Sequence, residues 1–219
     1  MTNKQPALMG IIASLIAALL TALFGIFVVL DNKTIYFLAV LLLSFSVIIM
    51  VISVRTFIAH EKETFINCAV AFTIAYAVLV SMVYFTQLST VIKGILNADQ
   101  QMIVSDAPGN VFFFIDMLGY VFLCVSTLFM LFAVEKRYRL FRVFLGIHSV
   151  MAIPTFLLPF LPISFSTNEA SGQISGNFIL IVWCFVFIPV CLLAADYFRR
   201  QRNVEKDELK GRTFSQATN

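Results

Sequence analysis

Six long apolar stretches divide this chain, and the basic residues are distributed around them very unevenly. The stretches cover residues 7–30, 34–58, 64–91, 111–134, 140–163 and 175–198. Each is long enough for a helix to cross a hydrocarbon core of about 30 Å, which takes about 20 apolar residues. Of the fifteen lysines and arginines, only Lys33 and Lys93 fall in the odd-numbered connections. Because such residues collect on the cytoplasmic side, the pattern predicts an all-α polytopic membrane protein with both termini cytoplasmic.

Composition supports the same class and leaves little room for a second domain. The chain has 219 residues, of which 60% are hydrophobic and only 12% are charged, unlike a soluble globular protein. We expect one transmembrane domain over residues 1–198, with its six helices in an antiparallel bundle. Residues 199–219 are predicted to form a polar, disordered cytoplasmic tail. The net charge of +3 is explained by contact with anionic lipid head groups, so the bilayer, and not a nucleic acid, is the expected partner.

No pattern for a catalytic centre, a cofactor or a metal is present in the sequence. All four cysteines lie inside apolar stretches, which excludes disulfides across the connections and a CxxC redox centre. A zinc hydrolase needs three or more protein ligands, usually rich in histidine, whereas only His60 and His148 are available. We therefore expect no catalytic, cofactor-binding or metal-binding residues.

The first stretch carries small residues at every fourth position. They are Gly10, Ser14, Ala18 and Ala22. Such a face lets a second helix backbone approach closely. We expect a partner helix within the same chain, and the alternative is a homo-oligomer formed through this face.

Two further features concern the predicted outer side. Residues 94–104, in the only long connection, are predicted to form a short interfacial helix, which would be either a lid over a cavity or a solvated connector. Pro154 and Pro159 should kink the fifth span in its outer half, because each removes a backbone donor.

Asp116 and His148 are the ionisable residues inside the spans, where a charge costs about 2.5 to 3.5 kcal/mol at the helix centre. At 100° per residue, each shares a helix face with other polar side chains, and polar faces turn away from lipid. The resulting prediction is a polar, outward-facing pocket between the third, fourth, fifth and sixth spans. Its candidate ligand-binding residues are Tyr84, Gln87, Asp116, Tyr120, Asn177 and His148.

Both ionisable residues also have a purely structural interpretation. Asp116 would fix helix register if it is satisfied by a tyrosine hydroxyl and a glutamine amide. His148 would be a neutral core histidine, which needs only one or two hydrogen-bond partners. The two residues differ in depth by roughly 10 Å, so we do not expect a direct pair.

The segments Tyr84-Phe85-Thr86-Gln87-Leu88 and Phe112-Phe113-Phe114-Ile115-Asp116-Met117-Leu118-Gly119-Tyr120 resemble a known family. It is a family of uncharacterised bacterial six-helix membrane proteins, a domain of unknown function, and the resemblance covers about residues 66–135. The resemblance implies six spans and a bacterial inner membrane, and it supplies no activity.

Three classes of function remain. The sequence favours a non-enzymatic protein that binds, senses or permeates a small molecule or an ion through the outer pocket. The first alternative is an accessory or structural membrane subunit without its own ligand site. The second is an intramembrane enzyme, which ranks last because no nucleophile, metal site or base pair is evident.

The charge distribution yields a direct test of orientation. After Ser166→Cys, the new thiol should react with an impermeant thiol reagent added outside, whereas after Gln201→Cys it should not. The reverse labelling pattern would invert every inside and outside assignment.

Overall fold

The computed structural model describes residues 4–105, 110–160 and 180–203. Its helices are α1 (Lys4–Val29), α2 (Lys33–Arg55), α3 (Glu63–Thr86), α4 (Ala98–Val104), α5 (Val111–Ala133), α6 (Arg139–Val150) and α7 (Ala152–Leu157). A C-terminal helix covers Leu180–Asn203. Single helical turns lie at His60–Lys62, Gln87–Val91 and Leu158–Phe160. Within these described ranges six helical segments, with α6 and α7 counted as one, are long and apolar enough to cross a membrane. This confirms the all-α polytopic class.

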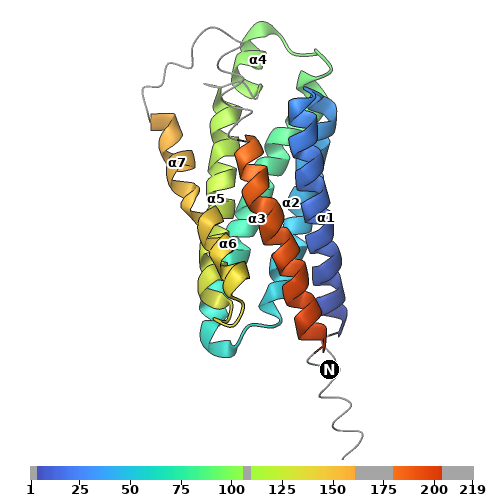
Figure 1. Ribbon diagram of the computed structural model, residues 1–219. Helices are drawn as coiled ribbons and strands as arrows, with labels where there is room; N and C mark the ends of the chain where they lie inside the picture. Colours follow the sequence, from blue (N-terminus) through green and yellow to red (C-terminus); the bar gives the residue numbers. More distant parts are fainter. Residues whose placement is uncertain (1–3, 106–109, 161–179, 204–219) are drawn as a thin grey trace, which may run out of the picture.

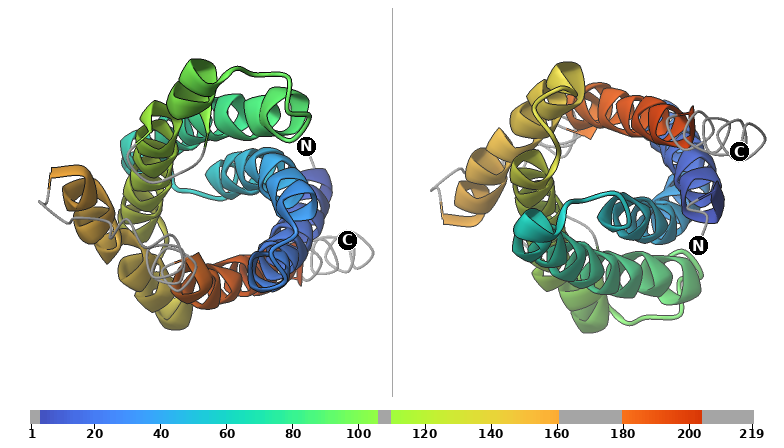
Figure 2. Two further views of the ribbon diagram at one scale, coloured as in Figure 1. Left: turned by 90° about the horizontal axis from the view of Figure 1, so that it is seen from above. Right: turned by 90° about the horizontal axis from the view of Figure 1, so that it is seen from below.

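The spans form a closed ring in chain order. Viewed along the bundle, α1, α2, α3, α5 and α6 follow one another, and the C-terminal helix lies beside α1 (Figure 2). Short connections force neighbouring spans to run antiparallel. As a result, α1 begins and the C-terminal helix ends at the same end of the bundle, which we call the terminal end (Figure 1). Helix α4 lies at the opposite end, which we call the α4 end.

Small residues of α1 close the ring. A Cβ atom added at Gly10 would lie 2.6 Å from the ring of Phe198, and one added at Gly25 would lie 3.3 Å from Cys184 Sγ. Ser14 and Ala18 of the same face are buried. The small face is therefore used inside the protein, which bears out the intramolecular expectation. Gly10, Ser14 and Ala18 are buried within the protein, and the alternative of a homo-oligomer through Gly10, Ser14, Ala18 and Ala22 stays a prediction.

The α3 and α5 helices meet through a glycine and a hydroxyl pair. A Cβ atom at Gly119 would lie 2.8 Å from Val80 Cγ2, so the two backbones approach closely. Deeper in the bundle the Thr73 and Ser126 hydroxyls are 2.7 Å apart, and Ser126 Oγ also donates to the Ala69 carbonyl at 2.9 Å. Hydrogen bonds between membrane helices of this kind contribute about 0.6 kcal/mol on average.

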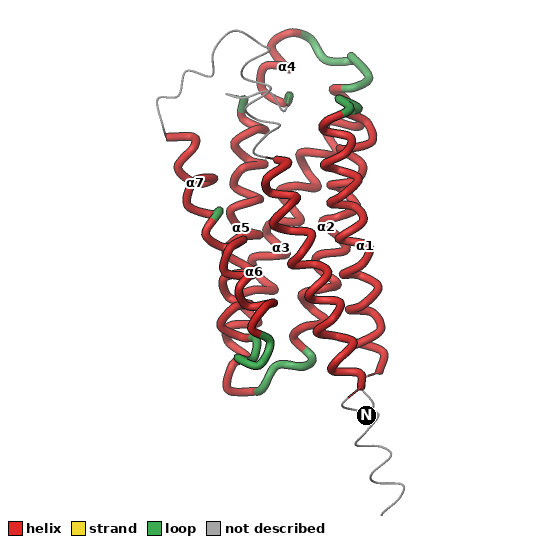
Figure 3. Tube along the Cα trace, in the orientation of Figure 1, coloured by secondary structure: helices red, strands yellow, loops and turns green. Residues whose placement is uncertain are grey.

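The fifth span is broken in its middle. Helix α6 ends at Val150 and α7 starts at Ala152, with Met151 as a turn between them (Figure 3). Pro154 has no N–H to donate to the carbonyl of Val150, four residues earlier, which explains where the break falls. Beyond the break α7 lies outside the ring (Figure 2), and none of its residues is buried. The predicted kink is therefore present, but the half of the span beyond the break does not line the interior.

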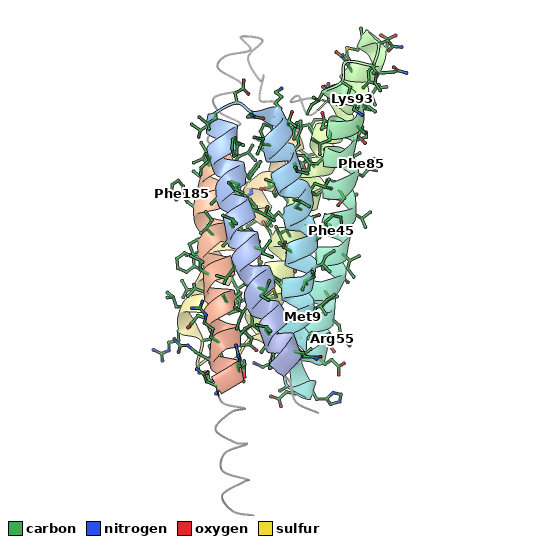
Figure 4. All side chains as sticks on the ribbon, turned by 90° about the vertical axis from the view of Figure 1, so that its right-hand side faces the viewer. Met9, Phe45, Arg55, Phe85, Lys93 and Phe185 are labelled. Atoms are coloured by element: carbon green, nitrogen blue, oxygen red, sulfur yellow. The ribbon has the colours of Figure 1, made fainter. Side chains whose placement is uncertain are left out.

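Apolar side chains cover the outside of the ring. Phe45, Phe85 and Phe185 project away from the bundle, and Arg55 and Lys93 mark its opposite ends (Figure 4). Phe185 is 74% exposed. In a soluble protein so much exposed apolar surface would be unfavourable, whereas in a bilayer it contacts hydrocarbon. The outside of the ring is therefore the lipid-facing surface.

The C-terminal helix is longer at the terminal end than the sequence predicts. It continues through Asn203, so residues 199–203 are helical and do not belong to the expected tail. Arg200 Nε contacts Asp196 Oδ2 at 2.8 Å, one turn earlier, as expected for a surface acid at the end of a span. The remainder of the predicted tail, 204–219, lies outside the described residues.

Gly10→Ala should destabilise the protein, because the added methyl group would overlap the buried ring of Phe198. Overpacking of this kind costs typically 1–3 kcal/mol, against a helix-propensity gain of about 1 kcal/mol. Gly146→Ala is the matched control, since its Cβ would lie at an ordinary 3.7 Å from Leu131 Cδ2. Thermal unfolding in detergent should show a lower midpoint for Gly10→Ala only, and Phe198→Leu in the same chain should recover part of the loss. Equal midpoints for both alanine variants would contradict the close contact.

Candidate functional site

A carboxylate and two tyrosines form a buried polar cluster near the α4 end. Asp116 lies in the second turn of α5, and Tyr84 lies in the last turn of α3. The Tyr84 hydroxyl donates to Asp116 Oδ2 at 2.9 Å and lies 3.5 Å from the Tyr120 hydroxyl. Asp116 and the two tyrosines are all buried. Helical periodicity predicts that the polar faces of α3 and α5 meet. In the structure they do, and these three side chains lie together.

Gln87 lies one turn beyond Tyr84 and connects the bundle to α4. It begins the π-helical turn Gln87–Val91, in which Ile92 N bonds to the Gln87 carbonyl. Its side-chain Nε2 donates to the carbonyl of Val104, the last residue of α4. Single π turns occur frequently at functional sites. The long connection therefore contains a helix, α4, which begins four residues later than the predicted 94–104 and is attached to the C-terminal end of α3 through the Gln87 amide.

Aromatic rings surround the cluster. The Tyr84 ring lies 5.4 Å from Phe37 on α2, and the Tyr120 ring lies 5.1 Å from Trp183 on the C-terminal helix, both measured between centroids. Rings at these separations gain about 0.5–1.5 kcal/mol per pair beyond their area burial. The cluster is thus enclosed by side chains from α2, α3, α5 and the C-terminal helix.

Two fully buried oxygens, one on α3 and one on the π-helical turn that continues it, lack a hydrogen-bond partner among the described residues. They are Tyr76 Oη and Gln87 Oε1. The Tyr76 ring packs against Tyr120 at 6.1 Å. A buried oxygen without a partner costs about 1–3 kcal/mol, and native proteins keep few of them without a reason. These oxygens flank the acid cluster on both sides along α3 and can accept hydrogen bonds from a ligand.

His148 belongs to a separate network nearer the middle of the bundle. Trp183 Nε1 donates to His148 Nε2 at 3.1 Å, and Thr127 Oγ1 lies 2.9 Å from His148 Nδ1. The indole N–H is only a donor, so Nε2 must be the unprotonated nitrogen and Nδ1–H donates to Thr127. The Thr127 hydroxyl in turn donates to the Cys124 carbonyl at 2.8 Å. The imidazole is therefore held neutral in one tautomer, with both nitrogens used.

The structure separates the six candidate residues that the sequence groups together. Tyr84, Asp116 and Tyr120 form the cluster, and Gln87 lies beside it with its amide on α4. His148 has its hydrogen-bond partners on Thr127 and Trp183, and its place in a shared ligand site stays a prediction. Asn177 lies outside the described residues.

Sequence reasoning missed Trp183, which belongs to both groups. It packs on Tyr120 and hydrogen-bonds His148. A tryptophan in an apolar stretch reads as one more apolar residue, although a buried indole N–H usually has an acceptor. Trp183 is the chain's single tryptophan. Its need for a buried acceptor was the feature of the sequence that could have indicated His148 as its partner.

Comparison with known proteins finds no matching protein family, no matching curated protein and no matching solved structure. The resemblance over residues 66–135 thus identifies no family, while the six spans that it implies are present. In the described ranges, no group of three or more histidine, cysteine, aspartate or glutamate side chains is placed to hold a metal ion.

The His148 network predicts unequal effects of two substitutions at Thr127. Thr127→Val removes the acceptor for His148 Nδ1–H while keeping the shape, and it should lower the free energy of unfolding by about 0.6–1.7 kcal/mol, the range for membrane hydrogen bonds. Thr127→Ser keeps the hydroxyl and should lower the free energy of unfolding by less than Thr127→Val does. Equilibrium unfolding in mixed micelles would measure both, and a valine variant as stable as the serine variant would show that the hydrogen bond contributes nothing.

Proposed function

We propose that this polytopic membrane protein binds a small cation or a protonated small molecule at the Asp116–Tyr84–Tyr120 cluster and acts in sensing or permeation, not in catalysis. One observation carries the proposal: an aspartate buried within a membrane span is held by a tyrosine hydroxyl, beside further buried oxygens that have no partner among the described residues. Ionisable groups inside a membrane are costly, and they mark ion pathways or ligand sites by default.

The chemistry of the cluster suits a positive charge. A carboxylate supplies the charge, tyrosine hydroxyls supply oxygen ligands, and the rings of Phe37 and Trp183 add aromatic surface beside it. Aromatic faces attract cations by about 0.5–2 kcal/mol, most when water is excluded. The single negative charge of an ionised carboxylate would balance the charge of one bound monovalent cation, and the neutral oxygens would complete its coordination.

Access from the α4 end follows from the position of the cluster. Asp116 lies in the second turn of α5, and α5 begins at the α4 end of the bundle (Figure 1). The link from Gln87 to Val104 holds α4 next to this end of the bundle. A ligand entering from there would reach Asp116 before any deeper polar group.

The same proposal includes the orientation of the protein in its membrane. Ten described lysines and arginines, from the loops and helix ends, lie at the terminal end, namely Lys4, Arg55, Lys62, Lys136, Arg137, Arg139, Arg142, Arg199, Arg200 and Arg202. Lys33 and Lys93 lie at the α4 end. The positive-inside rule then favours cytoplasmic termini, with the cluster open to the outer side of a bacterial cytoplasmic membrane, as the resemblance implies.

Asp116→Asn tests the proposal because it keeps the shape and removes the charge. If the cluster binds cations, sodium, potassium or tetramethylammonium should raise the melting temperature of the parent, and the increment should grow with rising pH, since only the ionised carboxylate attracts a cation. Without cation, the free energy of unfolding of Asp116→Asn should lie within about 1 kcal/mol of that of the parent. Added cation should no longer raise the melting temperature of this variant. Asp116→Leu should be less stable, because the Tyr84 hydroxyl loses its acceptor.

The matched control is Asp99→Asn on α4, which removes an exposed acid at the same end of the bundle. This variant should keep the cation response of the parent. Superimposable melting curves for the parent and Asp116→Asn at every pH and in every cation would make Asp116 a structural residue and refute the site.

A further inference from the structure

A second polar site lies at the terminal end, far from Asp116. A half-open cavity of about 200 Å³ separates the start of α6 from the end of the C-terminal helix. Its lining includes three arginines, Arg137, Arg139 and Arg200, and one acid, Asp196. The buried residues Tyr138 and Phe141 also line it. The cavity lining is thus predominantly cationic and aromatic.

The acids nearby do not neutralise this charge. Asp196 is paired with Arg200 at 2.8 Å, and Glu135 is paired with Arg137 at 2.8 Å. Arg139 forms no ion pair within the part of the chain that the structure describes. Each guanidinium has five N–H donors, and the two paired arginines use only some of them on carboxylates. One uncompensated positive charge and several unused donors therefore face the cavity.

The first turn of α6 adds backbone donors to the same place. Arg139, Leu140 and Phe141, its first three residues, all line the cavity. Their amides have no carbonyl partner within the helix, and Tyr138 provides no side-chain cap. The N-terminus of a helix favours anions through these amides and the helix dipole. Guanidinium groups and amides together are suited to the oxygens of a phosphate.

An apolar stripe leads from the cavity along the lipid-facing side of α6. Leu140, Val143, Ile147 and Val150 are all exposed and lie at helical spacing on one face. Leu140 also lines the cavity, as does Leu193. A free phosphate ion would make no use of this stripe, whereas acyl chains attached to a bound phosphate would lie along it.

We infer that the cavity between α6 and the C-terminal helix binds the phosphate of an anionic phospholipid, with Arg139 as its principal charge partner and the acyl chains along α6. Basic pockets between membrane helices on the cytoplasmic side bind such head groups. Arg137 is held in place over the Tyr138 ring, with its guanidinium carbon 5.0 Å from the ring centroid.

The test uses the full chain in nanodiscs of phosphatidylcholine alone and of equal parts phosphatidylcholine and phosphatidylglycerol. The anionic lipid should raise the melting temperature of the parent, and titration with short-chain phosphatidylglycerol in detergent should give a saturable affinity. Arg139→Gln should weaken that affinity roughly tenfold or more, as expected for one charge-assisted hydrogen bond. Arg139→Lys keeps the charge but loses the planar fork, and should fall between the two.

Arg199→Gln is the matched control, since Arg199 is exposed at the end of the C-terminal helix, next to Arg200, but does not line the cavity. It should bind as the parent does. Equal losses in Arg139→Gln and Arg199→Gln would show general surface attraction, and no loss in Arg139→Gln would exclude its role; either result overturns the site. Inorganic phosphate added to phosphatidylcholine nanodiscs should not reproduce the stabilisation, and full reproduction would assign the site to a soluble phosphate and refute the lipid.

Discussion

Close contact between α1 and the C-terminal helix is the constraint on which the rest of the bundle depends. Gly10 and Gly25 leave room for Phe198 and Cys184, so the last helix can lie against the first and close the ring. That closure brings Trp183 inward, where it meets both Tyr120 and His148. Without hydrophobic driving force between helices in lipid, such small-residue packing and interior hydrogen bonds hold a bundle together. The Asp116 cluster and the His148 network therefore both depend on the position of Trp183 on the C-terminal helix.

Much of this arrangement could be predicted from the sequence because helical periodicity fixes which side chains share a face. Thr73, Tyr76, Tyr84 and Gln87 are all buried, and the pairing of Asp116 with Tyr84 follows from facing α3 and α5. Periodicity does not tell how far a helix leans, so the departure of α7 from the ring was not predictable. Nor does it identify which polar side chain pairs with which, so the hydrogen bonds of His148 to Thr127 and Trp183 do not follow from periodicity.

The two buried ionisable residues differ in what their surroundings require. The imidazole of His148 is neutral, and a donor on one side with an acceptor on the other satisfies it completely. A carboxylate accepts up to four hydrogen bonds and, when ionised, carries a charge that hydrocarbon does not stabilise. Burying an ionised Asp116 therefore costs more than burying a neutral His148, which is why the proposed function is placed at Asp116.

The position of His148 also explains how the broken fifth span stays attached to the ring. The helical hydrogen-bond pattern is interrupted at Val150, where Pro154 cannot donate, and α7 beyond it is exposed. His148 lies two residues before the break, in the last turn of α6, and its ring nitrogens join α5 and the C-terminal helix through Thr127 and Trp183. Because the helix is broken after Val150, the last turn of α6 depends on side-chain contacts to keep its rotation relative to the neighbouring helices. An apolar residue at this position would fill the space but would not fix the rotation of α6, because packing alone tolerates sliding whereas two directed hydrogen bonds do not.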